Sequence, residues 1–302
     1  MTPASVASPS RRDEAGENAA ALARSRARER ALFLGLSMPA TLIILIVIFL
    51  PVVWLSSLSF FDRAGELSLE NYRRLTGDLY LEAFNVTFQI SAAVTVLCVV
   101  LGYPLTYWLS RQSEQTANLL LICVLLPFWT AVLVRTYAWL VLLQRNGLIN
   151  SSLLSVGLID QPLQLAHNLP ASIIGMVHIM LPFLVLPLYA SMKAIDPDLV
   201  RAAIGLGSSP TRAFWRIFVP MSLPGLFAGV VLVFVLSLGF YVTPALLGGG
   251  RVQMLAQRIE STITIFSNWG AASALGVVLL VMALALVAIL HRVFGLDRLF
   301  VR

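Results

Sequence analysis

The stretch DPDLVRAAIGLGSSPTRAFWRIFVP, from Asp196 to Pro220, is a polar segment between two long apolar blocks. Asp196 can cap a helix whose first position is Pro197, because proline's fixed φ and missing N–H suit the start of a helix. Gly207 predicts the end of this first helix, since glycine adopts the left-handed conformation at low cost. The apolar residues at helical spacing in this helix are Leu199, Ala202, Ala203 and Leu206.

A second short helix is expected after this turn. Ser209 can cap it, with Pro210 at its first position, and Pro220 is expected to end it. The apolar residues on one face of this helix are Phe214, Ile217 and Phe218. The stretch therefore predicts two short helices joined by a turn, with an apolar face on each helix.

The composition of the whole chain indicates an integral membrane protein. Hydrophobic residues make up 58% of the 302 residues and charged residues only 12%, far from the averages of soluble domains. Runs of roughly 20 apolar residues recur, and a helix of that length spans the hydrocarbon core of a bilayer. The net charge of +6 does not indicate nucleic-acid binding, because the basic residues lie mainly beside the apolar runs. The partner that the composition implies is the lipid bilayer.

We expect an all-α fold with six transmembrane helices, at about 32–58, 85–109, 118–143, 170–194, 222–246 and 271–290. Fourteen of the 21 Lys and Arg residues then lie on the side of both termini, which the positive-inside rule identifies as the cytoplasm. Residues 1–30 are expected to form a basic, partly disordered cytoplasmic extension, and residues 31–302 the membrane domain. A cleavable signal peptide is not expected, since no apolar run directly follows a short basic head.

Motifs for catalysis or metal binding are not found in the sequence. Cys98 and Cys123 both lie in apolar runs, and the three histidines, at 167, 178 and 291, lack the spacing of metal ligands. The sequence contains no phosphate-binding loop of the G-x-x-x-x-G-K-[ST] type, no nucleophile elbow and no paired carboxylates. We therefore expect neither an enzyme nor a bound metal or cofactor.

The polar segment resembles the EAA loop of ABC importer permeases. The matching positions are Ala202-Ala203, Gly207, Ile217 and Val219-Pro220, whereas the family usually has Glu at the position of Arg201. In that family the loop forms cytoplasmic coupling helices that dock into a groove on a separate ATPase subunit. The residues that the resemblance implies in this contact are Arg201, Ala202, Ala203, Gly207, Ser208, Ser209, Pro210, Phe214, Ile217 and Pro220.

A second stretch, LPFWTAVLVRTYAW at 126–139, resembles the signature of the spermidine/putrescine branch of these permeases. Shorter matches occur at 157–165, 179–190, 240–249 and 268–272. The chain is thereby identified as a member of the type I (MetI-like) family of ABC importer inner-membrane permeases. The resemblance implies a six-helix bundle that carries polyamines, with a cytoplasmic ATPase dimer, a second homologous permease subunit and a periplasmic substrate-binding protein as partners. ATP and Mg would bind to the ATPase, and this chain would bind neither.

The residues expected to line the solute pathway are Trp129, Arg135, Tyr137, Trp139, Tyr241 and Glu260. Aromatic rings suit an organic cation, because a cation–π contact contributes about 0.5–2 kcal/mol. Trp129 and Tyr137 are eight residues apart and are expected near one helical face. The alternative is that these Trp and Tyr residues anchor the helices at the membrane interface.

Arg135 is the one charged residue inside a predicted span, which makes a functional role the default hypothesis. A cation in the pathway would repel a polyamine, so we expect Arg135 to pair with an acidic residue of this chain or of a partner. Snorkelling to the outer surface is the alternative. Glu260 is a candidate acidic gate residue, with a solvated loop carboxylate as the alternative.

The same residues also allow alternative solutes and an alternative class of transporter to be considered. The same machinery could carry an opine, an amino-acid derivative or a phosphonate. A secondary transporter would need inverted repeats and intramembrane carboxylates, and neither is found in the sequence. Gly225 and Gly229, in a G-x-x-x-G pattern, predict a close approach of two helices.

Overall fold

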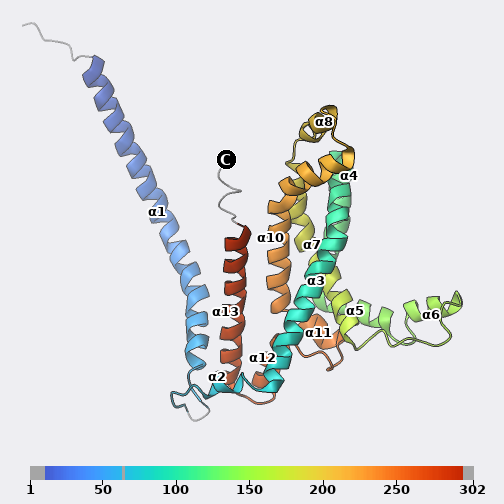
Figure 1. Ribbon diagram of the computed structural model, residues 1–302. Helices are drawn as coiled ribbons and strands as arrows, with labels where there is room; N and C mark the ends of the chain where they lie inside the picture. The colour runs from blue at the N-terminus through green and yellow to red at the C-terminus, as the bar shows by residue number, and fades with distance from the viewer. Residues whose placement is uncertain (1–10, 63–64, 295–302) are drawn as a thin grey trace, which may run out of the picture. The chain divides into compact units, whose positions relative to one another are not determined.

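The computed structural model describes residues 11–62 and 65–294, almost all of them in helices and the short connections between helices (Figure 1). The chain divides into two units, the first ending at Ser57 and the second beginning at Leu58. Helix α1 (Arg11–Leu58) accounts for the described part of the first unit. Its segment Leu32–Leu58 contains an 18-residue stretch with a mean hydropathy of 2.6 and is long enough to cross a membrane. The expected division into a basic extension and a membrane domain at residue 31 stays a prediction, and residues 1–10 lie outside the described residues.

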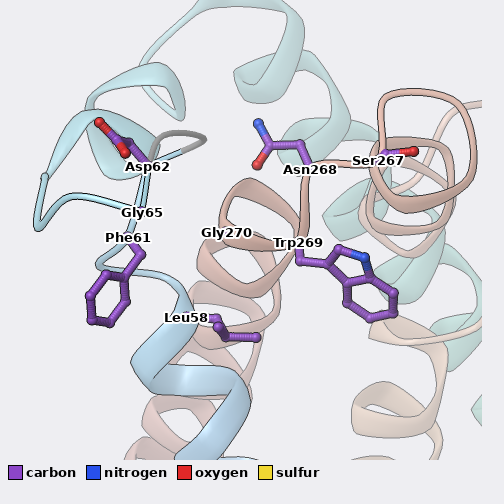
Figure 2. A pocket seen from close by; sticks show the side chains of 8 residues that line it. All are labelled: Leu58, Phe61, Asp62, Gly65, Ser267, Asn268, Trp269 and Gly270. Carbon is purple, nitrogen blue, oxygen red and sulfur yellow. The ribbon is translucent and has the colours of Figure 1, made fainter.

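A compact turn opens the second unit and leads into helix α2 (Glu70–Arg74). The buried Asn71 donates from Nδ2 to the carbonyl oxygens of Ser59, at 3.1 Å, and Phe61, at 2.8 Å. The Tyr72 hydroxyl lies 2.7 Å from the hydroxyl of Ser59. These bonds satisfy backbone groups that the turn leaves without helical partners. A pocket lies beside this turn, next to the start of helix α13 (Trp269–Phe294) (Figure 2).

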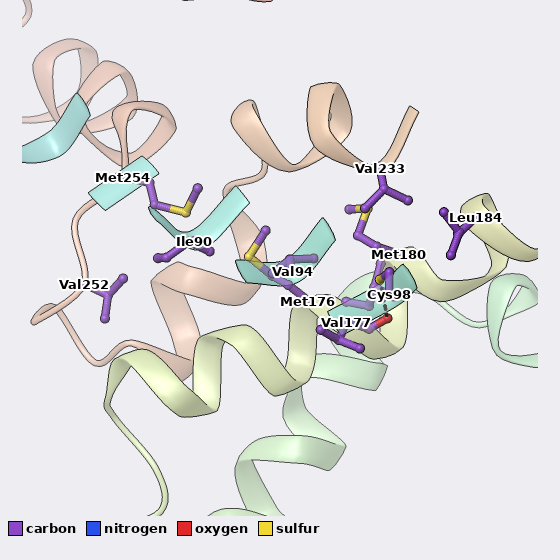
Figure 3. Packing of buried hydrophobic residues seen from close by; sticks show 11 residues of the cluster. Ile90, Val94, Cys98, Met176, Val177, Met180, Leu184, Val233, Val252 and Met254 are labelled. Carbon is purple, nitrogen blue, oxygen red and sulfur yellow. Dashed lines mark hydrogen bonds between the residues drawn. The ribbon is translucent and has the colours of Figure 1, made fainter. Parts of the chain in front are cut away.

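Three long helices form the centre of the second unit: α3 (Asp78–Ser110), α7 (Leu169–Lys193) and α10 (Val219–Leu238). Figure 3 shows their buried side chains packed together, with Ile90 and Val94 of α3 against Met176 and Met180 of α7. The Cys98 thiol donates to the carbonyl oxygen of Val177 at 3.8 Å. Helix α13 packs against α2, α3 and α12 (Leu255–Thr264) through a separate cluster of buried residues.

Helices α7 and α10 approach each other closely at the two glycines of the predicted G-x-x-x-G pattern. A Cβ atom at Gly229 would lie 2.9 Å from the Leu184 side chain and 3.0 Å from the Leu184 carbonyl oxygen. A Cβ atom at Gly225 would collide with Ser191 and with the carbonyl oxygen of Pro187. The predicted close approach is confirmed. Backbone packing of this kind holds helices together in lipid, where the hydrophobic effect between helices is absent.

The third predicted span, 118–143, is not one continuous helix. It is divided into α4 (Glu114–Leu125), the 3₁₀ turn η1 (Leu126–Trp129) and α5 (Val132–Leu143), with α6 (Leu148–Ser155) following. The two halves are bent by 94° at the break after Trp129. Pro127 provides no N–H, and Thr130 is extended with ψ 144°, which ends the helix. The described residues thus contain five continuous helices long enough to span and one bent pair, in agreement with the predicted count of six.

The fifth predicted span, 222–246, is also interrupted. Helix α10 ends at Leu238, and the chain turns at Gly239 before the short helix α11 (Val242–Leu247). Pro244 cannot donate a backbone hydrogen bond to the preceding turn, and the residue before a proline disfavours the helical conformation. Helix α11 packs against α5 and α7, and the hydroxyls of Thr136 and Thr243 lie 3.0 Å apart.

The glycine contact between α7 and α10 makes a testable prediction. The substitution Gly225→Ala places a methyl group against backbone as well as side-chain atoms of α7, so it should destabilise the chain by about 1–3 kcal/mol. The matched control is Gly276→Ala in α13, where a Cβ atom meets nothing within 4 Å. Thermal unfolding of the purified chain in detergent measures both. Equal midpoints for the two variants would contradict the tight packing.

Candidate functional site

The coupling segment, residues 196–220, lies at the end of the second unit where α3 and α7 also end, opposite α2 and α12 (Figure 1). Its first helix is α8 (Pro197–Gly205), and the Asp196 side chain caps it by accepting from the Asp198 N–H at 2.9 Å. Gly207 has a φ of +93°. The N–H of Gly207 donates to Ile204 at 2.9 Å and that of Ser208 to Ala203 at 3.0 Å. This pair of bonds is the Schellman motif, so the predicted cap and the predicted turn are both confirmed.

The second helix begins as predicted and ends elsewhere. Ser209 caps α9 (Pro210–Ala213) by accepting from the Arg212 N–H at 3.3 Å. A π-helical turn, η2 (Phe214–Phe218), then continues directly into α10, so the predicted end at Pro220 is wrong. In an α-helix the Pro220 ring would clash with the carbonyl group four residues earlier. The wider π turn, in which the Val219 N–H donates to Phe214, takes up this conflict and the helix continues.

Aromatic rings attach the coupling segment to α3. The ring centroids of Phe214 and Phe218 lie 5.0 and 5.1 Å from that of Tyr107, edge to face in both cases. The guanidinium carbon of Arg111 lies 5.2 Å from the Tyr107 centroid and 5.1 Å from the Phe218 centroid. We call these four residues the aromatic anchor. Aromatic pairs and cation–π contacts each stabilise by about 0.5–1.5 kcal/mol beyond the burial of area.

Helix α8, in contrast, contains no fully buried side chain. Leu199 is 45% exposed, Leu206 is 90% exposed, and Ile204 is exposed as well. Arg201, at the position where the related loops usually have Glu, pairs with Asp198 at 3.0 Å. Both side chains are about three-quarters exposed, so this ion pair contributes little to stability. The apolar side of α8 is therefore available to another polypeptide.

The remaining coupling residues divide by exposure. Ala202, Gly207, Ser209, Pro210 and Pro220 are exposed, whereas Ala203, Ser208, Phe214 and Ile217 are half-buried. The exposed group, apart from Pro220 in α10, lies in α8 or at the turn between α8 and α9. The half-buried group faces the bundle, where Phe214 contacts Tyr107. The segment thus has one side held by the bundle and one side open.

Arg135 lies on α5 with only 8% of its surface exposed. Within residues 11–62 and 65–294, its Nε and Nη1 atoms have no hydrogen-bond partner and no acidic residue forms an ion pair with it. The expected pairing with an acidic residue of the same chain is therefore not found in the described part. The side chain also does not reach an exposed surface, as snorkelling would require.

Trp139, one helical turn after Arg135, contacts a residue that the sequence did not single out. Its indole N–H donates to Nδ1 of His178 on α7 at 3.2 Å, with the two rings edge to face at 5.9 Å. Because Nδ1 accepts this bond, the neutral His178 carries its proton on Nε2. The only sequence signal for His178 was its position inside an apolar run.

The other predicted pathway residues do not converge. Trp129 is 88% exposed at the end of η1, and the 94° bend separates it from the exposed Tyr137, so the expectation of one shared face is wrong. Tyr241 precedes α11, and Glu260 lies half-buried on α12, accepting from the Thr264 hydroxyl at 3.1 Å. No hydrogen bond or ring contact joins these residues to one another in the part of the chain that the structure describes.

The pocket in Figure 2 has a volume of about 550 Å³ and is lined by residues that follow α1 and residues that begin α13. Its polar side chains are those of Asp62, Ser267 and Asn268. The rings of Phe61 and Trp269 point away from each other (Figure 2). A cation would therefore not find two facing rings here. The Asp62 carboxylate already accepts from the Glu66 N–H at 2.9 Å. The pocket does not form the aromatic cage that binds an organic cation.

The chain is similar to known membrane transport proteins along most of its length. The family model described as binding-protein-dependent transport system inner membrane component matches residues 22–299. The spermidine/putrescine transport system permease protein PotB of Haemophilus influenzae is 32% identical over 251 residues, which cover 81% of this chain and 88% of that protein. PotB of Escherichia coli K12 is 34% identical over 250 residues, which cover 80% of this chain and 91% of that protein.

A solved structure shows the same fold. It is a chain in the crystal structure of a bacterial alginate ABC transporter in complex with an alginate pentasaccharide-bound periplasmic protein. The TM-score is 0.72 at 16% sequence identity, and the match covers 89% of this chain and 95% of that chain. At this identity the likeness supports the arrangement of helices and says nothing of the solute.

The isolation of Arg135 makes a prediction about stability. Breaking a buried ion pair by removing one partner costs about 3–5 kcal/mol, whereas removing an unpaired buried charge is neutral or stabilising. We therefore expect Arg135→Met to leave the unfolding midpoint of the purified chain unchanged or raised. Thr136→Val, which removes the hydroxyl bonded to Thr243, is the neighbouring comparison and should lower the midpoint. A larger loss in Arg135→Met than in Thr136→Val would reveal an acidic partner within the chain.

Proposed function

Because this chain belongs to the family of binding-protein-dependent transport system inner membrane components, we propose that it is the permease subunit of an ABC importer for polyamines. The observation that carries the solute class is the match over four fifths of the chain to spermidine/putrescine permeases of two bacteria. The chain is a multi-pass inner-membrane protein with both termini in the cytoplasm. It catalyses no reaction itself, and ATP with Mg binds to a separate ATPase.

The assembly that performs import has further subunits. Two ATPase subunits bind at the cytoplasmic face, a second permease homologous to this chain completes the solute path, and a periplasmic binding protein delivers the solute. Binding and hydrolysis of ATP move the two permeases between inward-open and outward-open arrangements. The exposed residues Leu199, Ile204 and Leu206 of α8 fill a groove of one ATPase subunit. The exposed apolar side chains of this helix support the docking, because the rest of the chain leaves them uncovered.

The coupling segment is built to transmit a displacement into the bundle. Its second helix runs without interruption through η2 into α10. The aromatic anchor fixes the same helix to α3. The close contact at Gly225 and Gly229 fixes α10 to α7. A push on α8 therefore reaches three spanning helices through backbone and ring contacts, with the turn at Gly207 as the joint.

The position of Arg135 supports a cationic solute. Its side chain is 8% exposed, so its charge is withdrawn from any surface that a polyamine would pass. The exposed rings of Trp129 and Tyr137 remain available to an organic cation or to the second permease. An acidic residue of the second permease then supplies the partner that Arg135 lacks here. An anionic solute such as a phosphonate would instead need an accessible guanidinium at this position, and that of Arg135 is buried.

Substituting the joint should separate ATP hydrolysis from import. Gly207 has a φ of +93°, where a β-branched side chain is strongly disfavoured, so Gly207→Val should distort the turn without affecting membrane insertion. In proteoliposomes containing the complete importer, we expect at least a tenfold loss of solute uptake with ATP hydrolysis retained. The matched control is Gly205→Val, two residues earlier, where the backbone is helical and a Cβ atom meets nothing within 4 Å. Normal uptake by Gly207→Val would mean that this turn is not the coupling element.

The solute class is tested directly by uptake in the same proteoliposomes. Labelled spermidine should accumulate only when ATP is present, and a hundredfold excess of putrescine should compete. An excess of 2-aminoethylphosphonate should not compete, because the buried guanidinium cannot reach its phosphonate group. Uptake of the phosphonate in place of spermidine would refute the polyamine assignment while leaving the importer mechanism intact.

A further inference from the structure

A pocket of about 420 Å³ lies at the base of the coupling segment, and we call it the basal pocket. Its walls come from three places: the end of α3, the end of α7, and α8. The polar residues that line it are Ser110, Arg111, Gln112, Lys193 and Arg201, and its apolar lining includes Met192 and Phe218. This volume falls within the range of ordinary ligand sites, which is about 300–1,000 Å³.

The charge of the basal pocket has one sign. Three of its lining residues are basic and none is acidic. Arg201 is paired with Asp198 at 3.0 Å. Arg111 and Lys193 form no ion pair with any residue in the ranges 11–62 and 65–294. The pocket therefore offers two uncompensated positive charges to a bound anion.

The guanidinium of Arg111 is already oriented for such an anion. Its carbon atom lies 5.2 Å from the Tyr107 centroid and 5.1 Å from the Phe218 centroid, so two rings of the aromatic anchor hold it in place. A guanidinium held by ring faces keeps the N–H groups at its edge for a planar, two-bond contact with a phosphate. Less side-chain entropy is lost on binding because the rings restrict the side chain beforehand.

The level of the basal pocket relative to the membrane indicates the source of the anion. It lies where two spanning helices end together, α3 at Ser110 and α7 at Lys193. Residues at the ends of spanning helices lie at the level of the lipid headgroups. Anionic lipids are attracted to basic residues at this level.

We propose that the basal pocket binds the phosphate group of an anionic membrane lipid, with the lipid headgroup rather than free phosphate as the source. Arg111 forms the two-bond contact, and Lys193 adds a point charge. The bound headgroup touches α8 on one wall and the ends of α3 and α7 on the others, so it bridges the coupling segment to the bundle. The binding does not depend on the solute that the importer carries.

The test uses the purified full-length chain in a neutral detergent, with bound lipids counted by native mass spectrometry. The probes are dioleoylphosphatidylglycerol and, as the uncharged comparison, dioleoylphosphatidylcholine. We expect tighter binding of phosphatidylglycerol, and each basic residue removed should weaken it about fivefold. The double variant Arg111→Gln/Lys193→Gln should thus lose about 25-fold. The matched control Arg212→Gln/Arg216→Gln removes two exposed charges of the same segment outside the pocket and should retain the wild-type affinity.

Two further measurements make the test of lipid binding decisive. Lys193→Gln alone leaves the aromatic anchor intact and should weaken lipid binding about fivefold. This single variant tests the proposal even if the double variant misfolds. Inorganic phosphate at 20 mM should not displace the lipid, and full displacement would identify free phosphate as the source and refute the lipid proposal. Equal affinity for the two lipids, or equal losses in the pocket and control variants, would overturn it entirely.

Discussion

In a bilayer every backbone polar group must be satisfied within the protein, and the second unit is arranged around this constraint. The helices α3, α7 and α13 run through the unit without a break, whereas the third and fifth predicted spans are interrupted. The break between α10 and α11 lies against α5, with Thr243 bonded to Thr136. Without a hydrophobic drive between helices in lipid, close backbone contact holds the unit together, as where α10 meets α7 at Gly225 and Gly229.

The coupling segment is attached to this bundle by aromatic and cation–π contacts instead of close backbone packing. Its apolar residues divide into those that the bundle buries, such as Phe218, and those of α8 that it leaves exposed. The division matters because a segment anchored on both sides could not receive a partner, and one anchored on neither could not transmit its motion. The π turn at Phe214–Phe218 makes the anchored half continuous with a spanning helix. The basal pocket lies at the junction of the two halves, so an anion bound there would act on the same contact.

The sequence predicted what is decided by local chemistry. The caps at Asp196 and Ser209, the left-handed turn at Gly207 and the close approach at Gly225 each depend on a few neighbouring atoms. Pro220 misled the prediction because its local preference is to end a helix, and the π turn that accommodates it is a property of the whole segment. Pro127 signals a break or a kink within its apolar run, but the size of the bend that follows, 94°, is not a local property of the sequence. The bond from Trp139 to His178 joins residues 39 positions apart, and single-sequence spacing carries no signal for it.

Two features of this chain lack a partner within its described residues, one apolar and one charged. The apolar side of α8 is exposed at one end of the unit, and two donors of Arg135 lack acceptors within the described residues. A protein that functions alone would not retain a buried cation without a partner, because the desolvation of its charge is repaid only by an ion pair or by hydrogen bonds. Such groups are retained when a second molecule completes them. In the assembly that we propose, the ATPase completes α8 from the aqueous side and the second permease completes Arg135 from within the membrane.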